Sequence, residues 1–137
     1  YGINHGFLMN GCRAQKDTAA PTRGGRVLPL DGVSQYVELH NTVNDFKDTA
    51  IATWVKWTGG APDQRIWSMG DGAGREMYLT PLDGTTGGLR FVITDGVTTE
   101  TQDDAALPTK VWKHAAVEFS RSTCTLSHNG AAAAPAP

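Results

Sequence analysis

Short stretches in which apolar and polar residues alternate recur along most of this 137-residue chain. A period of two residues is typical of half-buried β-strands, and no segment shows the 3.6-residue period of an amphipathic helix. Residues 49–57 are apolar enough on both faces of an extended backbone to predict a central strand. The alternation therefore predicts a chain built from strands.

Turn-forming residues separate these stretches. Gly and Pro number 16 and 7, and Asp-Gly or Asn-Gly pairs such as Asp31-Gly32, Asp95-Gly96 and Asn129-Gly130 lie between the alternating segments. About nine short strands with turns every 8–12 residues predict an all-β antiparallel β-sandwich or jelly roll. The polar residues 14–25 are predicted to be a surface loop. The expected strands span residues 34–39, 49–57, 65–69, 76–80, 89–94, 112–119 and 124–128.

Composition supports one packed domain and excludes several partners. Hydrophobic residues make up 39% of the chain and charged residues 19%, so the chain has enough apolar residues to form a packed core. The net charge is −2 with no basic run, which disfavours nucleic acid and anionic membranes as partners. No apolar stretch reaches the ~20 residues that membrane insertion needs. We expect a domain at residues 1–130 and an Ala/Pro-rich tail or linker at residues 131–137.

The order of the segments resembles a known family. Residues 30–39 read LDGVSQYVEL, residues 48–56 read DTAIATWVK, residues 111–117 read VWKHAAV and residues 125–130 read TLSHNG. These motifs are similar to consecutive strands of the laminin-G-like, concanavalin A-like jelly-roll domains. Residues 4–11, NHGFLMNG, resemble the segment that opens such domains.

The resemblance implies a function outside the cell. It implies a non-catalytic carbohydrate-binding or adhesion module, secreted or at the cell surface and accessory to a glycoside hydrolase or a surface protein. Domains of this kind continue through further strands after the Asn129-Gly130 turn, so the chain resembles an incomplete copy. The alternative is a structural or protein-interaction module, whose open sheet edge is completed by another chain or a homo-oligomer.

An enzyme is not expected. A retaining glycosidase needs two carboxyl groups about 5–5.5 Å apart, commonly from one strand. Glu38, Glu76, Glu100 and Glu118 have no second acid two or four residues away on the same strand. Asp103 and Asp104 are adjacent, so their side chains would point to opposite faces.

Candidate glycan-binding residues follow from the chemistry of sugar recognition, which combines aromatic stacking with hydrogen bonds to hydroxyl groups. The candidates are Trp57, Arg65, Tyr78 and Arg90. A structural ion pair is the alternative use of either arginine. Trp54, Trp112 and His114 lie mid-strand and are predicted to be core residues.

The resemblance also implies calcium at the rim, held by turn carboxylates. The candidate ligands are Asp31, Asp71 and Asp95, with Asp83 as a further one, and the alternative is that each serves its own turn. Cys12 and Cys124 could form a disulfide in an oxidising compartment, or remain two buried free thiols.

Overall fold

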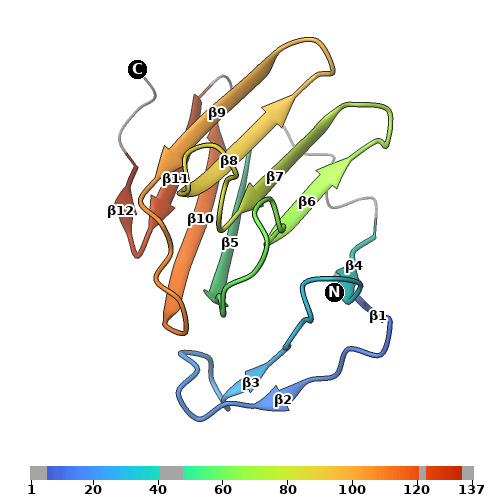
Figure 1. Ribbon diagram of the computed structural model, residues 1–137, viewed down its shortest axis with the longest axis vertical. Coiled ribbons are helices and arrows are strands. Elements are labelled where there is room, and N and C mark those ends of the chain that lie inside the picture. The colour runs from blue at the N-terminus through green and yellow to red at the C-terminus, as the bar shows by residue number, and fades with distance from the viewer. Residues whose placement is uncertain (1–5, 41–47, 121–122, 134–137) are drawn as a thin grey trace. The chain divides into compact units, whose positions relative to one another are not determined.

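The computed structural model describes residues 6–40, 48–120 and 123–133, and every regular element in these ranges is a β-strand. All strand pairs are antiparallel, which confirms the predicted all-β class. The chain divides into two compact units, Tyr1–Phe46 and Lys47–Pro137. The single domain expected at residues 1–130 stays a prediction. Figure 1 shows the strands of both units.

The first unit holds two small strand pairs. Strand β1 (Phe7–Met9) pairs with β4 (Tyr36–Glu38), and β2 (Gln15–Lys16) pairs with β3 (Arg26–Val27). Strand β2 lies inside the predicted loop 14–25, so that prediction is wrong at its start. The pairing depends on Gly25, whose φ is 62° and on which a Cβ atom would come within 2.8 Å of the Asp17 carbonyl oxygen.

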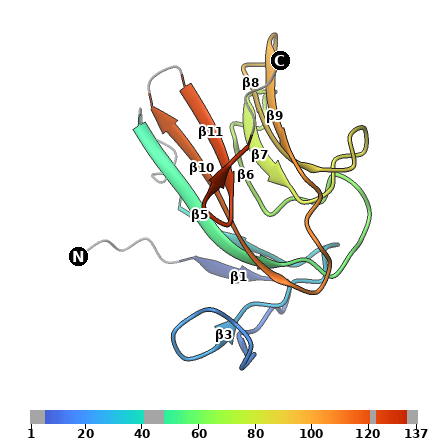
Figure 2. The same ribbon diagram turned by 90° about the vertical axis from the view of Figure 1, so that its left-hand side faces the viewer.

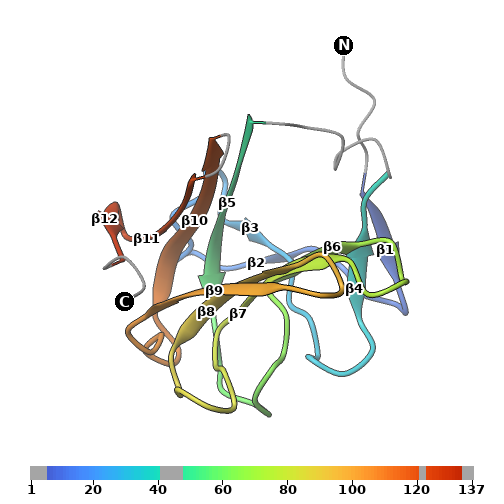
Figure 3. The same ribbon diagram turned by 90° about the horizontal axis from the view of Figure 1, so that it is seen from above.

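The second unit consists of two four-stranded sheets. Sheet I has the order β12-β11-β10-β5, and sheet II has the order β6-β7-β8-β9. Figures 2 and 3 show the two sheets as separate layers. The strands of sheet I are β5 (Asp48–Lys56), β10 (Trp112–Ser120), β11 (Thr123–His128) and β12 (Ala131–Ala132). The strands of sheet II are β6 (Trp67–Gly70), β7 (Glu76–Thr80), β8 (Leu89–Thr94) and β9 (Thr99–Asp104).

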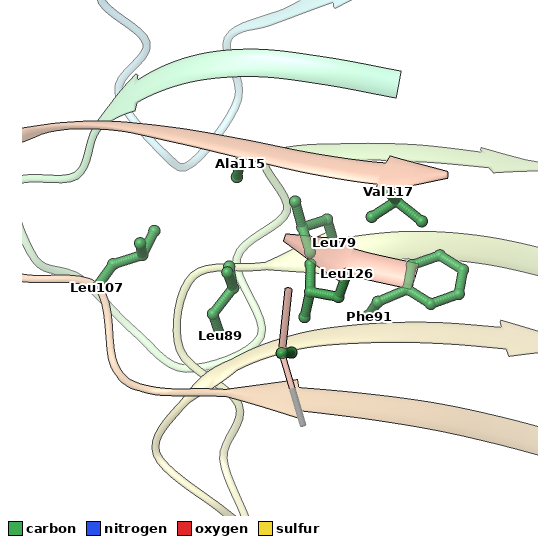
Figure 4. Packing of buried hydrophobic residues seen from close by; sticks show 8 residues of the cluster. Leu79, Leu89, Phe91, Leu107, Ala115, Val117 and Leu126 are labelled. Carbon is green, nitrogen blue, oxygen red and sulfur yellow. The ribbon is translucent and has the colours of Figure 1, made fainter. Parts of the chain in front are cut away.

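The hydrophobic core lies between these two sheets, as Figure 4 shows. Alternate residues of each strand point inward, so each sheet contributes one face to the core. Phe91 of sheet II stacks edge-on against Phe119 of sheet I, with ring centroids 5.3 Å apart. The buried residues of the core are Leu79, Leu89, Phe91, Leu107, Ala115, Val117, Leu126 and Ala133.

Strand β9 joins the two sheets at one side of the core. The Gln102 Oε1 atom accepts a hydrogen bond of 2.8 Å from the backbone N–H of Leu126 on β11. Two residues further along β9, the Asp104 carboxylate lies 3.9 Å from His128 Nδ1. Strand β9 was not predicted, because its residues read TETQDD and lack the apolar alternation that marks a strand. Glu100 and Asp104 therefore lie four residues apart on one strand, so the prediction that Glu100 has no such second acid is wrong.

The chain continues as a strand after the Asn129-Gly130 turn. Both turn residues have positive φ, 51° and 80°, as a tight hairpin turn requires. The turn lets Ala131–Ala132 pair with β11, and Ala133 is buried in the core. The predicted tail at residues 131–137 is therefore wrong for its first three residues, and residues 134–137 lie outside the described ranges.

Substitution of a buried and an exposed valine tests which residues form the core. Val117 is fully buried and Val97 is 94% exposed. Val117→Ala removes two methyl groups from packed surroundings and should cost about 2 kcal/mol of unfolding free energy. Val97→Ala should change it by less than about 0.5 kcal/mol. Urea denaturation measures both, and equal effects would contradict the assignment of the core.

Candidate functional site

The outer face of sheet II carries three of the four predicted ligand-binding residues: Arg65, Tyr78 and Arg90. The Arg65 guanidinium lies 4.0 Å from the centroid of the Tyr78 ring. It also donates two hydrogen bonds to the Glu76 carboxylate, at 2.7 and 3.1 Å. These bonds lower the pKa of Glu76. Arg65 therefore covers one face of Tyr78 and is itself held in an ion pair, which was the structural alternative.

Arg90 is held in the same way on this face. Its Nε and Nη2 atoms donate to Asp103, and its Nη1 lies 2.8 Å from the Asp83 carboxylate. The hydrogen bond to Asp103 raises the pKa of the guanidinium. Asp104 points instead to His128, so the predicted divergence of the two adjacent aspartates is confirmed. Arg90 thus brings together Asp83 and Asp103, two carboxylates that the sequence analysis did not pair.

Trp57 lies apart from these residues. Its side chain is half-buried and packs against the core between the sheets. Its indole Nε1 is buried without a hydrogen-bond partner. The structure therefore does not bring Trp57 together with Arg65, Tyr78 and Arg90, and the indole offers little surface to a ligand.

The outer face of sheet I carries an aromatic cluster that the sequence analysis missed. Trp54 is 43% exposed, because it points away from the core-packed Val55 beside it. The His114 ring meets it edge-on from β10, with centroids 5.2 Å apart and an interplanar angle of 64°. Next along the strands, Lys56 lies over the Trp112 ring at 5.3 Å. We call Trp54, His114, Trp112 and Lys56 the Trp54 platform.

The prediction that Trp54, Trp112 and His114 are core residues is therefore wrong. Strand β5 is apolar on both faces, so its alternation did not say which face is buried. One signal was available: Trp54 shares its face with the charged Lys56, whereas Val55 shares its face with Ile51. A lysine in phase with an aromatic residue indicates the solvent side of a strand.

Asp31, the first candidate calcium ligand, caps its own turn. One carboxylate oxygen accepts backbone N–H groups from Val33, Ser34 and Gln35, each at 2.9 Å. These bonds lower the pKa of Asp31 from 3.8 to about 2. The carboxylate therefore stabilises the turn above about pH 4, and that contribution is lost as the pH falls through about 2.

Asp71 and Asp95 cap the turns β6–β7 and β8–β9 at one rim of sheet II. Asp71 accepts from the N–H of Ala73 at 2.8 Å, and Asp95 accepts from Thr98 at 2.7 Å, and both pKa values are lowered by these bonds. The positive charge of Arg75 acts on both carboxylates. Among the described residues, no three His, Cys, Asp or Glu side chains gather as a metal site would need.

The two cysteines belong to different units, and both are free thiols in the structure. Burial raises the pKa of the Cys124 thiol to about 11. A half-buried thiol with a raised pKa is a poor nucleophile. The disulfide between Cys12 and Cys124 stays a prediction.

Comparison with known proteins gives one match. The family model described as the concanavalin A-like lectin/glucanases superfamily matches residues 31–137. This range includes β4 and every strand of the second unit, as well as residues 131–137. No curated protein and no solved structure matches the chain. The part of the chain that the structure describes holds no helix long and apolar enough to cross a membrane.

Chelation tests the role of the turn carboxylates. Since Asp31, Asp71 and Asp95 accept the N–H groups of their own turns, we expect EDTA and millimolar calcium to leave the melting temperature unchanged within about 1 °C. Asp71→Asn keeps the capping oxygen and removes a charge, so it serves as the matched variant. A calcium-dependent rise that Asp71→Asn abolishes would contradict this assignment and establish a calcium site at the rim.

Proposed function

Because the chain belongs to the concanavalin A-like lectin/glucanase superfamily, we propose that it is a non-catalytic carbohydrate-binding module that holds its glycan on the Trp54 platform. The observation that carries the proposal is the exposed indole of Trp54 on a sheet face, 43% accessible and flanked by His114. A glycan would stack on this indole without any bond being made or broken.

Stacking on a sugar ring needs an aromatic face open to solvent. Trp54 offers such a face, because its side chain is 43% exposed and the imidazole of His114, inclined at 64°, does not stack flat on the indole. Tyr78, the aromatic candidate on sheet II, has one face covered by the Arg65 guanidinium. The Trp54 platform is therefore the better sugar-binding surface of the two.

A polar side chain beside the indole can orient the bound sugar through hydrogen bonds. His114 has ring nitrogens that can donate to or accept from a sugar hydroxyl. It lies directly opposite Trp54 in the register of β5 and β10, so the sheet holds the two side chains next to one another. A ligand pocket of this kind combines an apolar surface with a few placed polar groups.

The ion-paired carboxylates on the outer face of sheet II support a binding role over catalysis on that face. Asp83 and Asp103 share the Arg90 guanidinium, and Glu76 is bound by Arg65. A glycosidase needs one carboxylic acid that carries a proton to the leaving oxygen. These ion pairs occupy the oxygen atoms on which that proton would have to sit.

The same proposal extends to where the protein is located and which protein it is part of. A module that only holds a glycan acts by keeping a linked enzyme or cell surface close to its carbohydrate. We therefore place the chain in a secreted or cell-surface protein, as an accessory to a glycoside hydrolase or an adhesion protein.

The test is binding to a panel of polysaccharides that includes cellulose, xylan and pectin, with Trp54→Ala as the variant. Loss of the stacked indole should weaken binding at least about tenfold. Tyr78→Ala removes an aromatic side chain from the other sheet and should leave binding unchanged. Both variants are first compared with the wild type by thermal melting.

Three outcomes would overturn the proposal or move the site. Absence of binding to any glycan in the panel and on a glycan array would reject carbohydrate binding. Loss of binding in Tyr78→Ala, with Trp54→Ala unaffected, would place the site on sheet II. Hydrolysis of a bound polysaccharide would show a catalytic module.

A further inference from the structure

The first unit contains a cavity that plays no part in the proposed function. Its volume is about 340 Å³, which lies at the lower end of the roughly 300–1,000 Å³ that pockets for small molecules occupy. The residues that line it lie within two segments of this unit, 11–15 and 29–35. A site built from these residues is therefore independent of the second unit's sheets.

The two segments are tied together by the fold of the first unit. Gln15 pairs with Val27 where β2 meets β3, and the Asn10 Nδ2 atom donates a hydrogen bond to the Ser34 carbonyl oxygen. Between them in the sequence, Cys12 is buried and lines the cavity. The cavity is thus formed before any ligand binds, and little backbone has to be ordered on binding.

The side chains on the 29–35 segment are held in place by their own turn. The Asp31 Oδ1 atom accepts three backbone N–H groups, whereas Oδ2 accepts one hydrogen bond, of 3.1 Å from the Ser34 hydroxyl. The Gln35 Oε1 atom accepts the Asp31 N–H at 3.2 Å. Since a carboxylate oxygen has two lone pairs, Asp31 Oδ2 can accept a further hydrogen bond from a ligand.

The side chains on the 11–15 segment are available to a ligand. Arg13 and Gln15 are exposed, and in the part of the chain that the structure describes neither side chain has a hydrogen bond or an ion pair. Arg65 and Arg90 of sheet II, by contrast, are each bound by carboxylates. The guanidinium of Arg13 offers five N–H donors, and the amide of Gln15 both donates and accepts.

The charges of the lining favour a ligand without net charge. The lining holds one positive and one negative side chain, Arg13 and Asp31. A metal cation would be repelled by the guanidinium, and an anion such as phosphate would be repelled by the carboxylate. A hydroxyl group both donates and accepts, so it can bond to either side chain. Leu30, which is 46% exposed, adds apolar surface for the C–H groups of a ring.

We propose that this cavity binds a neutral monosaccharide. Arg13 donates hydrogen bonds to the sugar hydroxyls, Asp31 Oδ2 accepts from one of them, and Gln15 does either. None of the described residues that line the cavity is aromatic, so hydrogen bonds rather than stacking hold the ring. The site is distinct from the Trp54 platform and does not rest on it.

The experiment records amide signals of the ¹⁵N-labelled chain by nuclear magnetic resonance during titration with glucose, galactose, mannose, xylose and N-acetylglucosamine. At least one sugar should shift the signals of Gly11, Gln15 and Gln35 in a saturable way. Arg13→Gln removes the charge and most of the donors, and should weaken binding at least about tenfold. Arg23→Gln, at an exposed arginine of the same unit outside the lining, should leave binding unchanged.

The same titration with sodium acetate, glycine and calcium chloride tests charged ligands. Shifts of the cavity signals by one of these, and by none of the sugars, would overturn the inference. So would the absence of saturable shifts with every sugar, or an Arg13→Gln variant that binds like the wild type.

Trp54→Ala separates this site from the proposed function. The variant should bind the monosaccharide as the wild type does, and loss of the saturable shifts in it would overturn the inference. A sugar that binds in the cavity of a chain to which no polysaccharide binds would reject the Trp54 platform and leave this inference standing.

Discussion

The burial of one face of each sheet against the other is the constraint on which the second unit depends. Leu79 and Phe91 from sheet II meet Val117 and Leu126 from sheet I, and all four are almost completely buried. Because successive side chains of a strand alternate, this contact decides what points outward at every other position. The bond between Gln102 and the Leu126 N–H joins the two sheets at the side of β9.

The two outer faces that result are chemically different. On sheet II, Arg65 and Arg90 are each bound by carboxylates, so their charges are matched within the sheet. On sheet I, the two exposed residues that precede Trp54 on its face of β5 are alanines, Ala50 and Ala52, so the indole projects beyond their side chains. The outer face of sheet II therefore carries side chains already bound in ion pairs, whereas the outer face of sheet I carries an exposed indole on which a ring can stack.

Much of the fold could be predicted from the sequence, because strands packed on one side alternate clearly. The bounds of β7 and β8 agree with prediction, and β5, β10 and β11 agree within a residue. Strand β9 was missed, since its polar sequence is held by pairing with β8 and by Gln102 rather than by apolar burial. The site was harder to predict. The ion pairs of Arg65 and Arg90 join residues far apart in sequence. On β5, which is apolar on both faces, the phase of Lys56 was the one sequence signal that Trp54 faces solvent.

The central claim is that Trp54 lies on the solvent face of β5, while Trp57 and Trp67 have their indole nitrogens inside the second unit. Nuclear magnetic resonance with a soluble paramagnetic agent tests it most directly. The account predicts strong broadening of the Trp54 ring signals and sharp, slowly exchanging indole N–H signals for Trp57 and Trp67. A Trp54 ring as protected as the other two would mean that the opposite face of β5 is buried, and would contradict the account.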